Sequence, residues 1–518
     1  MKRLSEKPTV RRSIERPGKC LPLAVVCLLS ACMVGPNYVK PPAAEMPVAF
    51  KGAELWKSAQ PQDGVIRGKW WEVFEDPALN ALEHRIEISN QNLAAAEAQF
   101  RQARALVQVA RSGYFPTVSA GASAMRYRNS QNVPTNTPAF VGPNNNFALS
   151  FDATWEPDIW GRVRRLVESS KAAAQASAAD LEMVRLSTQA ELAMDYFQLR
   201  GIDADRKLLD ETIVAYQKAL DLTRSLFKGG AASNADVVQA EAQLKTTQAQ
   251  AIDLGVQRAQ LEDAIAVLIG SPASTFSMPV SPLAATPPPV PVGVPSQLLE
   301  RRPDVAAAER RVASANAQIG VALAAYYPNI TLSAVGGFQG KSLSNWLDWP
   351  SRFWSLGPAA LTQTVLDGGL RSAQTDQARA VYDETVASYR QTVLTSFQDV
   401  EDNLAALGIL EQESQVQDEA VVAARKSVAL TTDQYKVGIV SYLNVVTAQT
   451  FALTDERTAV NIASRRMTAS VLLVKALGGG WTASSLPSGA ALTEKAKASG
   501  RTGSASVAQS PPASGKQN

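Results

Sequence analysis

The chain has 518 residues, with 51 lysine and arginine side chains against 48 aspartate and glutamate side chains and a single histidine, His84. One histidine argues against a histidine-based metal site and against a Ser-His-Asp triad. The small net charge of +3 gives no sign of a nucleic-acid partner. Nucleophile-elbow, phosphate-loop and zinc-protease motifs do not occur in the sequence, so we expect the protein not to be an enzyme.

The first 32 residues predict an export signal that ends in a lipidated cysteine. Seven basic side chains precede an apolar run over residues 20–29, which is too short to cross a bilayer as a helix. Leu29-Ser30-Ala31-Cys32 resembles the lipobox of bacterial lipoproteins, in which the signal is cleaved before the cysteine and the cysteine is acylated. Met33 stands where lipoproteins retained in the inner membrane usually carry aspartate, so the resemblance implies the outer membrane. The alternative is a buried N-terminal helix that ends in a chance cysteine.

Cleavage before Cys32 would also remove the other two cysteines, Cys20 and Cys27. We therefore expect a mature chain without a disulfide and without a cofactor, apart from covalent lipid on Cys32. The sequence after residue 34 contains no apolar stretch of roughly 18 residues or more, which argues against membrane-spanning helices.

Two copies of one unit of about 210 residues make up the body of the chain. Pro116 and Pro328 lie in similar sequences at an offset of 212, and Lys228 and Lys436 lie in similar sequences at an offset of 208. The proline-rich stretch Thr286–Pro295 joins the two copies.

Each copy contains a long segment that is nearly free of helix breakers, from Gly161 to Phe227 and from Leu370 to Gly438. Helices of this length extend roughly 100 Å. Beyond these segments, residues recur every seventh position at Ile439, Val446, Leu453, Val460, Met467 and Val474, and at Ala240, Thr247, Leu254, Leu261 and Leu268. This spacing predicts left-handed coiled-coil contacts. A neighbouring stripe that includes Leu443 and Arg457 is half polar, which favours helices side by side around a water-filled tube over a solid helical bundle.

Two pairs of short segments alternate apolar and polar residues, as membrane-barrel strands do. The alternation is clearest in residues 117–124, 147–155 and 330–334, and aromatic residues lie near the segment ends. Polar loops over 129–146 and 340–351 join each pair. A soluble sandwich would show similar alternation. Four membrane strands cannot close a barrel alone, so this interpretation requires an oligomer.

The predicted fold class is mainly α with membrane β, in which long coiled-coil helices accompany four amphipathic strands per chain. A C-terminal region rich in Ser, Ala, Gly, Pro and Lys predicts disorder. The expected segments are a signal peptide (1–31), a lipid-anchored segment (32–75), a first repeat (76–285, hairpin 114–156), a linker (286–300), a second repeat (301–480, hairpin 327–366, long helices 370–478) and a disordered tail (481–518).

Three motifs resemble those of the TolC/OprM-type outer-membrane factors, the NodT group of RND efflux lipoproteins. They are Val34-Gly35-Pro36-Asn37-Tyr38, the run Leu298–Val305 and Ala317-Gln318-Ile319-Gly320, within a match over roughly residues 32–481. The resemblance implies a homotrimer with a twelve-stranded β-barrel in the outer membrane and a periplasmic α-barrel. It also implies a periplasmic membrane-fusion adaptor and an inner-membrane RND pump as partners. Pro303 and Asp304 suit the first turn of a helix, which is a sufficient structural explanation of that motif.

The resemblance places the working site at a constriction of the periplasmic tip. Carried over by motif, Asp236 and Tyr435 match positions that bond neighbouring helices and hold the tip shut, while Leu443, Asn444 and Thr447 match positions that line the opening. Many relatives carry aspartate at one or both of the last two positions, so neutral Asn444 and Thr447 argue against strong cation selectivity. Ordinary capping of the helix after each turn is the alternative interpretation.

The function expected from these observations is a passive exit duct for small molecules such as drugs, metals or other toxic compounds. A duct for type I protein secretion is the first alternative, because the same fold serves both. A periplasmic coiled-coil adaptor or structural lipoprotein is the second, but it leaves the four amphipathic strands unexplained.

Overall fold

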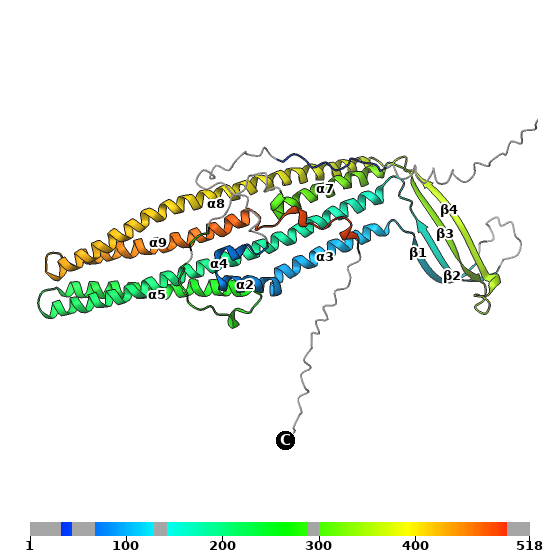
Figure 1. Ribbon diagram of the computed structural model, residues 1–518. Helices are drawn as coiled ribbons and strands as arrows, with labels where there is room; N and C mark the ends of the chain where they lie inside the picture. The colour runs from blue at the N-terminus through cyan, green and yellow to red at the C-terminus, as the bar shows by residue number, and fades with distance from the viewer. Residues whose placement is uncertain are drawn as a thin grey trace, which may run out of the picture.

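The computed structural model describes residues 33–43, 68–128, 130, 142–284, 286–288 and 300–494. The predicted signal peptide, Cys32, most of the predicted linker and residues 495–518 lie outside the described residues. The helices form a long, narrow layer, and a four-stranded sheet projects from one end of it (Figure 1).

The elements occur twice in the same order. The first set is α3 (Gln91–Ser112), β1 (Thr117–Tyr127), β2 (Asn144–Trp155), α4 (Arg162–Lys228) and α5 (Asn234–Leu268). The second set is α7 (Pro303–Ala324), β3 (Asn329–Gly340), β4 (Arg352–Thr362), α8 (Leu370–Lys436) and α9 (Tyr442–Ala476). Corresponding helices have equal lengths of 22, 67 and 35 residues. The first residues of α3 and α7 differ by 212 and those of α4 and α8 by 208, so the predicted duplication is confirmed.

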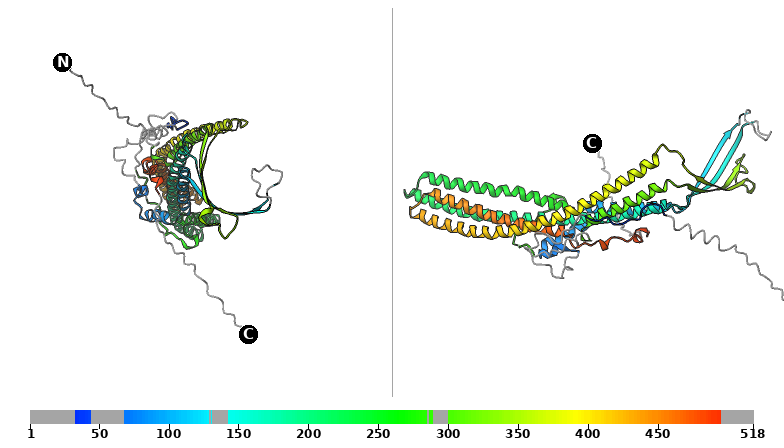
Figure 2. Two further views of the ribbon diagram at one scale, coloured as in Figure 1. Left: turned by 90° about the vertical axis from the view of Figure 1, so that its right-hand side faces the viewer. Right: turned by 90° about the horizontal axis from the view of Figure 1, so that it is seen from above.

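The two sets combine into one curved layer. The strands pair in the order β1-β2-β3-β4, and all three pairings are antiparallel. Beside the sheet the helices neighbour one another in the order α3-α4-α7-α8, and farther away in the order α5-α4-α9-α8. Figure 2 shows that this layer is curved about its long axis. Every described level of the layer is therefore four elements wide and ends in two lateral edges.

In each repeat two helices stack end to end, α3 with α5 at one lateral edge of the layer and α7 with α9 between α4 and α8. The Asn90 side chain accepts a hydrogen bond from Leu93 N at the start of α3 and donates to the Leu268 carbonyl at the end of α5, at 2.8 and 2.7 Å. In the second repeat, Arg302 donates to the Ala476 carbonyl at the end of α9, at 3.3 Å. Both side chains therefore satisfy helix-end groups that lack partners within their own helix.

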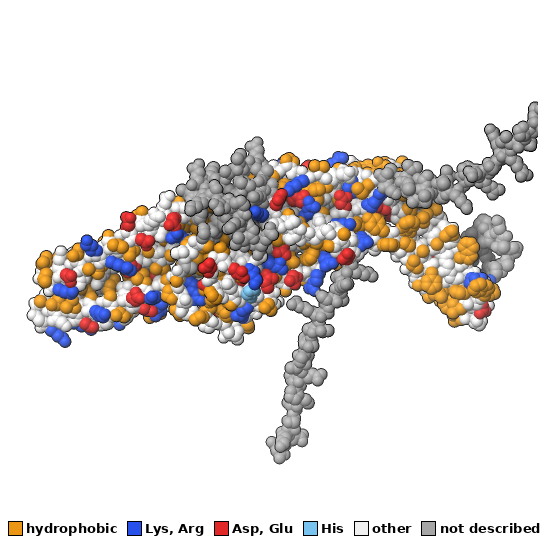
Figure 3. All heavy atoms as spheres, in the orientation of Figure 1, with side chains coloured by type: hydrophobic (Ala, Val, Ile, Leu, Met, Phe, Trp, Pro, Cys, Tyr) orange, Lys and Arg blue, Asp and Glu red, His pale blue; other side chains and the backbone are white. Residues whose placement is uncertain are grey.

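The sheet has the two-faced character that the alternation predicts. Val118, Ala120, Ala122 and Ala124 of β1 lie opposite Ala153, Phe151, Leu149 and Phe147 of β2, respectively. The other face pairs small or polar residues, such as Ser119 with Asp152 and Gly121 with Ser150. Hydrophobic side chains gather over the strands, whereas charged side chains lie mostly over the helices (Figure 3). Within the described part of the chain, no helix combines the length and apolarity needed to cross a bilayer.

The sevenfold spacing marks buried contacts between helices. Leu453, Met467 and Val474 of α9 are buried, as are Ala240, Leu244 and Leu254 of α5. The polar stripe that begins at Leu443, by contrast, starts on an exposed face, where Leu443 is 56% exposed. The predicted difference between the two stripes therefore holds only in part, because Ile439 of the first stripe is exposed near the tip and Val471 of the half-polar stripe is fully buried.

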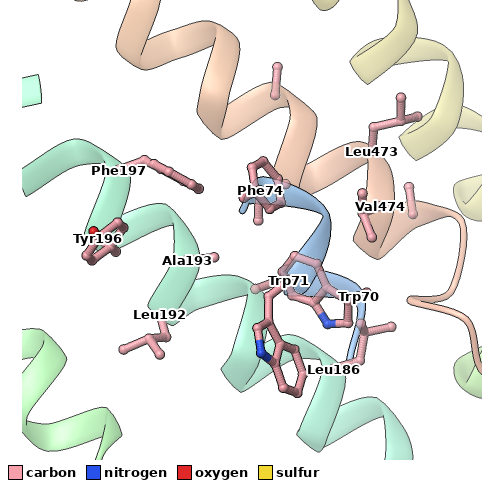
Figure 4. Packing of buried hydrophobic residues seen from close by; sticks show 14 of the residues in the cluster. Trp70, Trp71, Phe74, Leu186, Leu192, Ala193, Tyr196, Phe197, Leu473 and Val474 are labelled. Carbon is pink, nitrogen blue, oxygen red and sulfur yellow. The ribbon is translucent and has the colours of Figure 1, made fainter. Parts of the chain in front are cut away.

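The N-terminal segment packs against the middle of the helical layer. The 3-10 helix η2 (Trp70–Phe74) and helix α2 (Pro77–Ser89) contribute large buried side chains, and the Phe74 ring lies 5.0 Å from the Phe197 ring of α4. Trp70 donates its indole N–H to the Gln189 side chain at 3.2 Å. Figure 4 shows how these rings meet α4 and the end of α9. The largest hydrophobic core therefore lies midway along the molecule.

The segment after α9 is ordered farther than predicted. Leu492 is buried against Val107 and Ala174, and the side chains of Gln108 and Arg111 donate to the Thr493 carbonyl. The prediction of disorder from residue 481 is therefore wrong for residues 481–494. A few isolated apolar residues are enough here because α3 and α4 already supply the surface that they cover.

Glu83 of α2 is fully buried, and neither carboxylate oxygen has a hydrogen-bond partner among the described residues. Burial raises the pKa of Glu83 well above its ordinary value of 4.5, and the charge of Glu87 adds to the effect. The folded chain therefore keeps a proton that the unfolded chain releases as the pH rises above 4.5, so stability falls as the pH rises.

We expect Glu83→Gln, which mimics the protonated side chain, to stabilise the protein at pH 8 and to change little at pH 4. The gain should approach roughly 1.4 kcal/mol for each unit by which the pKa is raised. Denaturant unfolding of the wild type and the variant at both pH values measures it. An equal effect at both pH values would contradict the buried-acid explanation.

Candidate functional site

The five residues predicted for the gate lie together at the end of the layer that is remote from the sheet (Figure 1). There two tight turns connect α4 to α5 and α8 to α9. Gly230 and Gly438 occupy equivalent places in these turns, and each has φ of +77°, a conformation that favours glycine. The turns bring the starts of α5 and α9 to the same tip.

Asp236 caps its own helix. Its carboxylate accepts a hydrogen bond from Ser233 N at 3.0 Å, and Ser233 Oγ accepts one from Asp236 N at 3.2 Å. This reciprocal capping box supports the start of α5. Asn444, the counterpart of Asp236 in the second repeat, makes no such box, and its backbone N–H donates to the Ser441 carbonyl. Within one chain, Asp236 thus has the capping role that the sequence allowed as an alternative.

Tyr435 belongs to a buried cluster of three tyrosines that also contains Tyr216 and Tyr442. The Tyr435 and Tyr442 ring centroids are 5.2 Å apart, and only 7% of Tyr435 is exposed. Burial raises the pKa of Tyr435, and the nearby charge of Asp236 adds to that rise. The Tyr435 hydroxyl has no hydrogen-bond partner among the described residues. Burial, followed by the neighbouring tyrosines, raises the pKa of Tyr442 to about 12. The cluster therefore stays neutral at physiological pH.

The cluster joins the two repeats at the tip. Tyr216 of α4 donates to the Gln449 carbonyl of α9 at 3.3 Å, and Gln243 of α5 donates to both Tyr216 and Thr450. Sequence reasoning singled out Tyr435 but missed Tyr216 and Tyr442. Tyr442 stands directly before Leu443 in the motif, whereas Tyr216 lies within a long helix where no local signal marks it.

The three residues predicted to line the opening are exposed. Leu443, Asn444 and Thr447 are exposed on the first turns of α9, and Thr447 Oγ1 donates to the Leu443 carbonyl at 2.9 Å. They form a neutral surface separate from the buried tyrosines. The residues described here contain no group of histidine, cysteine, aspartate and glutamate side chains able to hold a metal ion.

Farther from the tip, ion pairs attach α5 and α9 to α4. Arg457 of α9 makes a two-pronged contact with Asp205, and Arg258 of α5 binds Asp203, which is almost fully buried. The two-pronged contact between Arg457 and Asp205 restricts relative movement of α4 and α9 more than a single bond would.

The family model described as outer membrane efflux protein matches residues 82–271 and 294–479, which include both repeats and the whole tip. The chain belongs to this family. It is 30% identical over 469 residues to the solvent efflux pump outer membrane protein SrpC of Pseudomonas putida, a match that covers 90% of this chain and 99% of SrpC. It is 31% identical to the antibiotic efflux pump outer membrane protein ArpC of Pseudomonas putida, over 89% of this chain and 95% of ArpC.

A solved structure shows the same architecture. The outer-membrane channel OprN superposes with a TM-score of 0.80 and 29% sequence identity, covering 87% of this chain and all of the OprN chain. This outer membrane efflux protein is thus the outer-membrane channel component of an efflux pump, with its strands in the outer membrane.

Proposed function

We propose that three copies of the chain close a single channel and serve as a passive exit duct. The observation that carries the proposal is the sheet itself, because β1 and β4 each pair on one side only within the chain. Hydrocarbon cannot satisfy the free N–H and C=O groups of an open edge, so copies must pair edge to edge. Three copies would supply the twelve strands of a barrel with an aqueous interior.

The lateral edges of the helical layer support the same assembly. Apolar side chains remain exposed on α5, at Val238, Ile252, Val256 and Val267, and on α8, at Ile409, Val416, Val422 and Leu430. Ile409, Val416 and Leu430 are separated by multiples of seven residues, which is the spacing of a coiled-coil contact. We infer that α5 and α8 of adjacent copies pack against each other and close the helical tube.

The proposed cargo is small organic molecules, since the relatives are named for solvent and antibiotic efflux. Energy would come from an inner-membrane RND pump through a periplasmic adaptor. Crosslinking in the intact envelope, followed by mass spectrometry, tests this assignment. Recovery of an adaptor and an RND pump supports it, whereas recovery of an ABC exporter would assign the channel to type I secretion instead.

The tip residues act as the gate in this proposal. Asp236→Ala removes the carboxylate half of the capping box of α5 and the charge beside the tyrosine cluster, so we expect higher conductance of the reconstituted channel. We also expect Tyr435→Phe to raise conductance, because it removes a hydroxyl that has no partner within the described chain and would bond an adjacent copy. The increase should be smaller, since the ring stays packed. Single-channel recording in planar bilayers measures both.

A matched control separates gating from helix capping. Ser233→Ala removes the hydroxyl half of the capping box, at a cost of about 1 kcal/mol to the helix, but leaves the Asp236 carboxylate and its bond from the backbone N–H of residue 233 in place. Its conductance should rise less than that of Asp236→Ala. Equal increases would show that Asp236 acts only by capping α5. Unchanged conductance in all three variants would refute the assignment of these residues to a gate.

Lipid on Cys32 is the remaining part of the proposal. Cys32 lies outside the described residues, but its neighbour Met33 packs against Gly161, where the last strand of the first repeat gives way to α4. An acyl group attached there would meet the membrane surface. We expect Cys32→Ser to abolish acyl labelling and signal cleavage in cells fed labelled palmitate, and retained label would refute the assignment.

A further inference from the structure

The channel explains neither the motif Val34-Gly35-Pro36-Asn37-Tyr38 nor Gly320 in the motif of α7. The structure brings both to one place, against Arg165 in the first turn of α4. We call residues 33–38 the strap, and the contact of the strap with Arg165 and Gly320 the anchor joint. The joint therefore connects the N-terminal segment to both repeats.

Arg165 is the centre of this joint. It is 1% exposed, yet its guanidinium donates to the Val34 carbonyl at 3.1 Å, the Gly35 carbonyl at 2.9 Å and Asn37 Oδ1 at 3.0 Å. Its remaining bond goes to Glu168, at 2.8 Å. A buried guanidinium needs acceptors for its fixed set of donors, and here three of the four acceptors belong to the strap. The buried charge therefore depends on the strap being in place.

Glycines make the close approach possible. A Cβ on Gly35, which has φ of +95°, would lie 2.5 Å from Gly320 Cα, and a Cβ on Gly320 would lie 2.8 Å from Arg165 Cδ. The strap is also held by α7, because Asn316 donates to the Pro36 carbonyl at 3.1 Å and Tyr38 donates to Glu309. These contacts hold the strap in place between α4 and α7.

The strap ends beside a pair of stacked aromatic rings. Val34 N donates to the Trp160 carbonyl at 3.1 Å, and the Trp160 ring stacks on Tyr327 at 4.8 Å. Tryptophan and tyrosine rings gather where a membrane meets water. Consecutive Cα atoms are about 3.8 Å apart, so residue 32 lies within one peptide unit of Met33.

We propose that Arg165 is the positioning residue of the lipid anchor. By holding the strap on α4 and α7, it delivers acylated Cys32 to the bilayer surface beside Trp160 without slack. The inference rests on the acylation proposed above and adds a specific role for the buried arginine and for the two glycine motifs. The partner in this proposal is a lipid surface: the acyl chains on Cys32 enter the inner leaflet of the outer membrane.

The test is the rate at which chymotrypsin separates the lipid from the body of the full-length channel in membrane vesicles. Cleavage after Tyr38 leaves the acyl label on the peptide of residues 32–38, and mass spectrometry follows this peptide because cuts after Phe50 or Trp56 also separate the lipid from the body. Because cleavage follows local opening, we expect Arg165→Met to lose the label at least about tenfold faster than wild type. Cleavage after fully buried Phe197 should not change.

Three further variants make the result decisive. Arg162→Met is the matched control, since the Arg162 side chain is 42% exposed, pairs with Glu156 and does not touch the strap. Arg165→Lys keeps the charge but not the fork, so it should restore part of the protection. Gly35→Ala dislodges the strap without altering α4, and it decides the question if Arg165→Met fails to fold.

The outcomes separate the anchor from its positioning. Wild-type protein without acyl label would overturn the anchor itself. A labelled protein that keeps wild-type protection in both Arg165→Met and Gly35→Ala would overturn the role of the joint and leave the anchor intact. Faster label loss in Arg162→Met than in Arg165→Met would also overturn it.

Discussion

Replacing Gly337 with alanine is expected to abolish the folded channel. A Cβ at this position would lie 1.9 Å from the Leu149 carbonyl oxygen and 2.9 Å from Ser150 Cα, so β2 and β3 could not keep their present spacing. The β2–β3 pairing joins the two repeats within the sheet. Overpacking against side chains costs about 1–3 kcal/mol, and a clash with backbone costs more. Heat-modifiable mobility of outer-membrane fractions should show loss of the folded species.

Gly336→Ala is the matched control for this variant. The residue is adjacent on β3, but its Cβ would lie 3.8 Å from Trp354 Cβ, an ordinary contact distance on the opposite face of the strand. Wild-type amounts of folded channel are expected. Equal losses for both variants would show that the strand tolerates no side chain there for reasons unrelated to the Leu149 contact.

Arg302→Met is expected to lower the free energy of unfolding by roughly 2–4 kcal/mol. Arg302 is 5% exposed and binds Asp304 at 2.7 Å, Asp399 of α8 at 2.9 Å and the Ala476 carbonyl at the end of α9. Methionine fills much of the space but satisfies none of these acceptors. Urea unfolding with a tryptophan fluorescence readout measures the loss.

Arg301→Met serves as the control, because Arg301 makes none of these three contacts and is only half-buried. Its effect should stay within about 0.5 kcal/mol, as for most surface substitutions. Similar destabilisation by both changes would place the cost in the loop rather than in the junction of α7, α8 and α9.

The periodic features of the fold could be predicted from the sequence. The two 67-residue helices follow from long stretches with a single internal glycine each, and the strands follow from alternation. Two offsets, 212 and 208, identified both copies. Each of these signals is local, because periodicity within one element decides which face it buries.

Contacts between distant residues could not be predicted in this way. Pro303 and Asp304 were expected at a helix start and are found there, but their neighbour Arg302 joins three helices, and no spacing reveals that. Asn90 performs the matching role with a different side chain. The tyrosine cluster could not be predicted for the same reason, since Tyr216 and Tyr442 come together only when both repeats have packed.

The interpretation of the tip was partly open for a physical reason. Ser233 and Asp236 have the spacing of a capping box, and the structure shows that box within one chain. Contacts between copies at the tip depend on the assembled ring, and a single sequence carries no direct signal for them. The gate therefore stays a prediction, which the conductance of Asp236→Ala and Ser233→Ala tests.

The central claim is that copies of the chain close a barrel by pairing β1 of one with β4 of the next. Ser119 lies on the polar face of β1 in the same row as Asp152, Val335 and Ser355. We combine Ser119→Cys in turn with a cysteine at each position of β4 and oxidise the protein in intact membranes. Disulfide-linked trimers should form where the β4 cysteine lies opposite residue 119 of the adjacent copy, and no variant with a single cysteine substitution should crosslink. Monomers alone at every β4 position would contradict the closed trimeric channel.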